Sequence, residues 1–124
     1  MKDDELLIGP DGHSSSFKKR MNSLSPGILD NLEALPQLDP ALAEKVYQSL
    51  MEMACQAQSW MAIITGQSCL RRIPLEWLRP RLQKTLEEYL LLNDSYEFHR
   101  LADLYQLLQE PIPAQLQNKL DLDI

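Results

Sequence analysis

The sequence predicts an all-α protein, a small helical bundle of about four helices with a disordered N-terminal tail. Leucine dominates the apolar residues, and Val46 is the only valine. β-branched residues favour strands, whereas unbranched residues are well tolerated in helices. Apolar residues also recur at spacings of three and four over long stretches, which is the period of a helix with one buried face.

We expect residues 1–27 to form the tail, because they are rich in Ser, Gly, Pro and charge and show no helical or strand period. An alternative is a short linear motif that docks on an acidic partner, made of Phe17, Lys18, Lys19 and Arg20. Residues 28–120 are expected to be a single helical domain, beginning with one or two turns before Pro36. Residues 121–124 are expected to form a frayed acidic end.

The first strong helix is expected to begin at Pro40, with Asp39 as its N-cap, and to end at Gly66 as the C′ residue. Its apolar stripe consists of Leu42, Val46, Leu50, Met53, Ala54, Ala57, Met61 and Ile64. Residues 53–64 are apolar or small on nearly all sides. This pattern is typical of a helix at the centre of a bundle or in an interface, so a homodimer through residues 53–64 is one expectation.

The stretch "IPLEWLRPRL", residues 73–82, contains two prolines within a helical pattern. Pro74 fits the first position of a helix, whereas Pro80 in a helix interior costs about 3 kcal/mol. Either a short helix ends and a new one begins at Pro80, or one kinked helix runs to residue 92. We favour the kinked helix, because an apolar stripe continues through the proline.

The next helix is predicted after "NDS", residues 93–95, with Asp94 as N-cap and Glu97 three residues later. The short connection makes this helix and the preceding one antiparallel neighbours. Pro111 ends the helix, and Pro113 opens a final short one.

No set of residues supports catalysis or a cofactor. The only histidines are His13 and His99, too few for an ordinary metal site, and no glycine-rich phosphate loop is present. Cys69 with His99 and Asp103 is a conceivable nucleophile site, but nothing in the sequence places them together. We therefore expect no enzyme activity, no catalytic or metal residue and no cofactor.

Residues 71–84 hold five basic residues against Glu76 alone, although the chain has a net charge of −6. The basic residues are Arg71, Arg72, Arg79, Arg81 and Lys84, and Trp77 lies among them. Arginine and tryptophan are typical of protein-interface hot spots. With Trp60, these residues are the predicted partner-binding set. A DNA-reading helix is the alternative, although the acidic remainder of the chain argues against it.

Residues 73–108 resemble a HEAT-like helical hairpin of small bacterial proteins. The matching residues are Ile73, Pro74, Glu76, Trp77, Asp94, Tyr96, Glu97, Phe98, Arg100, Leu101, Leu104 and Tyr105. The resemblance covers about a third of the chain and implies protein binding, since some such proteins neutralise or escort a partner. The chain departs from the pattern because it has no further repeats, and a solenoid needs about three.

These observations lead to one main functional prediction, a non-enzymatic module that binds and regulates, escorts or neutralises another protein. The partner is expected to be acidic on its contact face. The alternative is a transcriptional regulator that binds nucleic acid through residues 71–84. No signal peptide is visible, and Cys55 and Cys69 are expected to be free thiols, so we expect a cytoplasmic protein without a membrane span.

Overall fold

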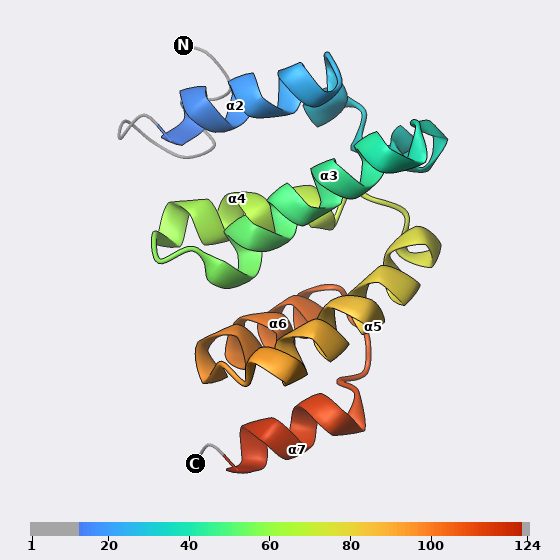
Figure 1. Ribbon diagram of the computed structural model, residues 1–124. Coiled ribbons are helices and arrows are strands. Elements are labelled where there is room, and N and C mark those ends of the chain that lie inside the picture. The colour runs from blue at the N-terminus through green and yellow to red at the C-terminus, as the bar shows by residue number, and fades with distance from the viewer. Residues whose placement is uncertain (1–12, 123–124) are drawn as a thin grey trace. The chain divides into compact units, whose positions relative to one another are not determined.

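The computed structural model describes residues 13–122, with side chains from Phe17 onward, and in this range it is helical without a strand. The all-α prediction is confirmed. Between residues 13 and 122 there are six α-helices with three short 3-10 and π turns, which is more than the expected four helices (Figure 1). The described residues fall into two compact units, unit 1 within Met1–Pro74 and unit 2 within Leu75–Ile124.

Unit 1 begins with α2 (His13–Leu24), which differs from the tail expected over residues 1–27. Phe17 and Met21 lie one turn apart and are both buried. These two side chains give the helix an apolar face, which the polar composition of the segment obscures. Residues 1–12 of the expected tail lie outside the described residues.

Two 3-10 turns connect α2 to the next helix, η2 (Ile28–Asp30) and η3 (Leu32–Gln37). Gly27 precedes η2 with a φ of +76°, a left-handed conformation that glycine adopts without strain. Pro36 lies inside η3. The expectation of one or two helical turns in this segment is confirmed.

The helix α3 (Pro40–Met51) starts as predicted, with Asp39 accepting hydrogen bonds from the N–H groups of Ala41 and Leu42. Such a cap stabilises a helix by about 1 kcal/mol. The prediction of one continuous helix to Gly66 is wrong. The chain passes through a π turn, η4 (Glu52–Gln56), and starts again as α4 (Trp60–Leu70), where the Ser59 side chain accepts from the Ala62 N–H.

The reason for this break is close packing of α4 against the end of α3 (Figure 1). Gly66 lies inside α4, not at its C-terminus, and a Cβ built there would lie 2.7 Å from the Ala54 nitrogen and 2.8 Å from the Leu50 oxygen. A continuous helix would leave apolar surface exposed on all sides, whereas folding back buries Met53 and Cys55.

Unit 2 begins with α5 (Leu75–Leu92), one helix that contains Pro80 in its interior. The favoured prediction of a continuous helix through Pro80 is therefore confirmed. Pro80 is exposed, and its missing N–H leaves the Glu76 carbonyl without its usual partner in the helix. Leu78, Leu82 and Leu86 on the opposite side are fully buried.

The turn to α6 (Ser95–Leu107) also follows the prediction, because Asp94 accepts from the N–H groups of Tyr96 and Glu97. The helices α5 and α6 are antiparallel neighbours (Figure 1). The end of α6 is a Schellman turn, in which Gln109 has a φ of +59° and Glu110 N–H donates to the Tyr105 carbonyl.

The last helix, α7 (Ala114–Leu122), follows Pro113 as expected and packs on α6 with Leu116 buried. It includes residues 121 and 122 of the expected frayed end, and residues 123–124 lie outside the described range. Among the helices of residues 13–122, each is too short or too polar to cross a bilayer.

Candidate functional site

The outward face of α4 carries three large apolar side chains. Trp60, Met61 and Ile64 are 61%, 39% and 37% exposed. At 100° per residue these three positions share one side of the helix, and buried residues such as Ile63 and Cys69 lie on the other side. No charged residue occurs between Gln56 and Leu70. Both the buried and the exposed sides of α4 are therefore free of charge, and Trp60 from the predicted set lies on the exposed side.

A pocket of about 580 Å³ opens in unit 1 between α2, η4 and the start of α4. Its lining residues are Phe17, Arg20, Glu52, Met53, Ala57, Gln58, Ser59 and Ala62. The volume is in the range of small-ligand pockets, and the mixture of apolar groups with one cation and one anion suits an amphipathic group. Sequence reasoning missed this pocket, because it assigned Phe17 and Arg20 to a tail and Met53 to Ala62 to one helix.

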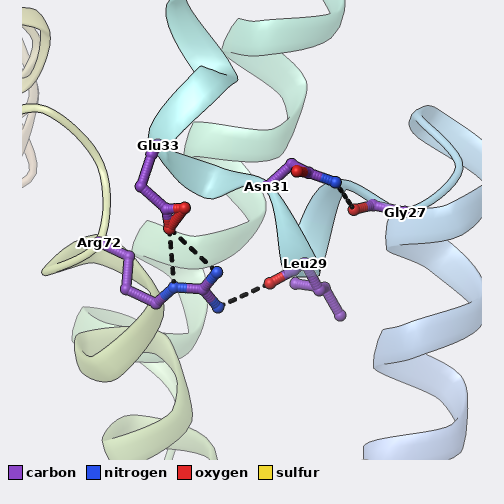
Figure 2. A network of polar contacts seen from close by, with 5 residues as sticks. All are labelled: Gly27, Leu29, Asn31, Glu33 and Arg72. Carbon is purple, nitrogen blue, oxygen red and sulfur yellow. Dashed lines mark hydrogen bonds and ion pairs between the residues drawn. The ribbon is translucent and has the colours of Figure 1, made fainter.

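Arg72 of the predicted partner-binding set is engaged inside unit 1 (Figure 2). Its Nη1 donates to the Leu29 carbonyl at 2.7 Å, and its Nε and Nη2 donate to Glu33 Oε1 at 3.2 and 3.1 Å. The neighbouring Asn31 Nδ2 donates to the Gly27 carbonyl at 3.1 Å. Arg72 therefore ties the end of α4 to the η2–η3 segment, which is a structural role. Arg71 is exposed at the end of α4.

Arg79 likewise forms its polar contacts with a residue of its own unit. Its Nε donates to Glu110 Oε1 at 2.7 Å and its Nη2 donates to Glu110 Oε2 at 3.3 Å, a bidentate pair. The hydrogen bond from Arg79 lowers the pKa of Glu110 below its ordinary value. Burial, with the nearby Glu110 charge, raises the pKa of the Tyr105 hydroxyl to about 12. The pair thus connects α5 to the turn after α6.

The remaining predicted residues, Trp77, Arg81 and Lys84, lie beside the buried leucine stripe of α5, where Trp77 and Arg81 are half-buried. Their spacing of four and three residues places them in one row along the helix. The Arg81 guanidinium carbon lies 3.5 Å from the centroid of the Trp77 ring, and Arg81 Nη1 donates to the Trp77 carbonyl at 2.9 Å. Lys84 is exposed, and Glu88 one turn further on limits the basic row to one half of α5.

The structure therefore divides the predicted partner-binding set between the two units. Arg71, Arg72 and Trp60 belong to unit 1, and the other four residues belong to unit 2. Within unit 2, Arg79 points to the turn after α6 and away from the row of Trp77, Arg81 and Lys84. Sequence proximity alone did not reveal this division, because the ion pairs join residues 39 and 31 positions apart.

The conceivable nucleophile Cys69 has the wrong protonation for that role. Burial raises the pKa of its thiol to about 11, and the Arg72 charge offsets only part of this effect. A thiol with this pKa is protonated near neutral pH and is a weak nucleophile. Cys69 and His99 lie in different units, and Asp103 forms an ion pair with Arg100 at 3.1 Å. In residues 13–122 no cluster of three or more potential metal ligands occurs.

Comparison of the chain with protein-family models, with curated proteins and with solved structures gave no match.

Proposed function

We propose that the chain is a non-enzymatic protein-interaction module that binds another protein through the row of Trp77, Arg81 and Lys84 on α5. The observation that carries this proposal is the stacked arrangement of Arg81 on Trp77. Binding would regulate, escort or neutralise the partner. The resemblance of residues 73–108 to HEAT-like hairpins, which bind proteins, supports the same proposal.

The arrangement suits an interface because it is organised before binding. A free arginine loses about 0.5–1.5 kcal/mol of rotamer freedom when a partner immobilises it. Arg81 is already held by the ring of Trp77 and by the Trp77 carbonyl, so it loses less. Tryptophan and arginine together are also the side chains most enriched among interface hot spots.

The chemistry of the row defines the kind of partner. Arg81 and Lys84 provide two positive charges beside an aromatic ring, so a protein surface that carries carboxylates would be complementary. Nucleic acid is a poorer fit, because Arg72 and Arg79 are engaged with Glu33 and Glu110 and the chain is acidic overall. Both cysteines are free thiols, which supports a cytoplasmic location for the interaction.

The test is a pull-down of the tagged full chain from its native host, with the captured proteins identified by mass spectrometry. The variant is Arg81→Glu/Lys84→Glu, which reverses the row and leaves the Arg79–Glu110 pair intact. The matched control is Gln37→Glu/Lys45→Glu/Gln48→Glu, three exposed residues of unit 1 with the same total change in net charge.

We expect one stoichiometric protein that is captured by the wild type and by the control and lost with the α5 variant. Equal capture by all three chains would exclude the α5 row as the binding surface. Capture of nucleic acid without a protein partner would contradict the proposal and favour a regulator of nucleic acid.

A further inference from the structure

We infer that α4 packs antiparallel against α4 of a second copy of this chain, through the exposed side that carries Trp60, Met61 and Ile64. This surface is in unit 1 and is separate from the α5 row on which the proposed function rests. Two observations support a second copy as the occupant, the absence of charge on this side and the order of large and small residues along it.

The absence of charge suits a two-fold interface. Two-fold symmetry brings a surface against itself, so any net charge near the axis meets the same charge on the other copy. From Gln56 to Leu70 the chain holds no Asp, Glu, Lys or Arg, although the sequence has 12 basic and 18 acidic residues in total. The residues of α4 themselves therefore bring no like charges together at the two-fold axis.

The order of residues defines the register. On the exposed side of α4 the row Trp60, Ile64, Ser68 has a spacing of four, with Ile64 in the middle. In an antiparallel pair centred on Ile64, the large Trp60 of one copy lies opposite the small Ser68 of the other, and the two Ile64 side chains meet. Arg71 follows Ser68 on the same side, where it can contact the face of the other copy's Trp60 ring.

The size of the surface sets the expected strength. The helix α4 has 11 residues, so it is about 16 Å long. One pair of such helices buries less than the roughly 800 Å² per partner of a standard interface. We therefore expect a weak, reversible dimer.

The experiment is sedimentation velocity of the full chain between about 1 and 200 µM. The variants are Ile64→Glu, Ile64→Lys and an equimolar mixture of the two. The matched control is Leu91→Glu, an equally large change at a side chain of unit 2 that is 88% exposed. Far-UV circular dichroism checks that each variant keeps its helix content.

We expect the wild type and Leu91→Glu to dimerise with rising concentration, and each Ile64 variant alone to weaken the dimer at least tenfold. In the mixture the two opposite charges face each other at the axis, so dimers should return. The inference is overturned if the wild type stays monomeric at the highest concentration, or if Ile64→Glu dimerises like the wild type. It is also overturned if the mixture associates no better than either variant alone, because residue 64 then does not face its own copy.

Discussion

Replacing Gly66 with alanine sets two physical effects of opposite sign against each other. Alanine in place of glycine stabilises a helix interior by about 1 kcal/mol through propensity alone. In unit 1, however, the new Cβ would lie 2.7 Å from the Ala54 nitrogen, 2.8 Å from the Leu50 oxygen and 2.9 Å from the Met53 Cβ. Two of these atoms belong to the backbone, so a side-chain rotation cannot relieve the contact.

The magnitude follows from the distance that the helices would have to move. Ordinary contacts of a Cβ begin near 3.4 Å, so α4 must separate from Ala54 in η4 by about 0.7 Å. Overpacking of a well-packed core costs about 1–3 kcal/mol, and a contact with fixed backbone belongs at the upper end of this range. After the propensity gain is subtracted, we expect Gly66→Ala to lower the free energy of unfolding by about 2 kcal/mol. For a unit of this size the midpoint of thermal unfolding would fall by on the order of 10 °C.

The two tryptophans make the assay specific, because Trp60 lies in unit 1 and Trp77 in unit 2. Urea unfolding monitored by Trp60 fluorescence, in a Trp77→Phe background, reports unit 1 alone. The control is Gln48→Ala in α3 of the same unit, an exposed site where the free energy of unfolding should change by less than about 0.5 kcal/mol. A Gly66→Ala variant as stable as its parent, or more stable, would refute the close approach of α4 to Leu50 and Ala54.

Further predictions concern the turns on either side of α6 and the buried thiol. Because the pKa of Glu110 is lowered in the folded state, its contribution is present above the ordinary glutamate pKa and is lost as the pH falls through the folded value. Glu110→Gln should therefore reduce the urea midpoint at pH 7, and the difference from wild type should vanish in acid; a constant difference would exclude the pair with Arg79 as the cause. Gln109→Gly should raise the free energy of unfolding by roughly 1 kcal/mol, because glycine adopts the positive φ without strain. Asn93 has a φ of +56°, and Asn93→Gly should raise the free energy of unfolding by less, because asparagine tolerates this conformation better than glutamine does. Cys69 should react with an aromatic disulfide reagent at pH 8 only after denaturation; rapid labelling of the native chain would contradict its raised pKa.

The starts of the helices could be predicted because their signals are local. Asp39 and Asp94 each cap the helix that follows, and both were assigned from residues within one turn of the chain. Pro113 before α7 is a similar local signal. The continuous α5 was also predictable, since its leucine stripe keeps the same phase on both sides of Pro80.

The fold-back after α3 was not predictable from periodicity. When a helix is apolar on all sides, its hydrophobic pattern does not show which side is buried. Nothing in the pattern then distinguishes one long helix from two short ones. The decisive features are a capping serine at Ser59 and a glycine at Gly66. Each is ambiguous alone, because Gly66 also fits a C-terminal position, and only the tertiary contact with Leu50 resolves the choice.

The candidate sites show the same limit. The arginines of residues 71–84 are neighbours in sequence, but their roles depend on where Glu33 and Glu110 fold. Arg72 and Arg79 become structural through those contacts, and Arg81 becomes part of an ordered surface through Trp77. Composition identifies such a group of cations, but it does not show which of them form ion pairs within the chain.

Because the two proposed surfaces belong to different units, each can be disabled without the other. Ile64→Glu should weaken self-association and leave capture of the protein partner by Arg81 and Lys84 intact at equal concentration of chains. Arg81→Glu/Lys84→Glu should abolish capture and leave the sedimentation of the purified chain unchanged. A variant that removes both properties would mean that dimerisation and partner binding are coupled. The two surfaces would then not act independently.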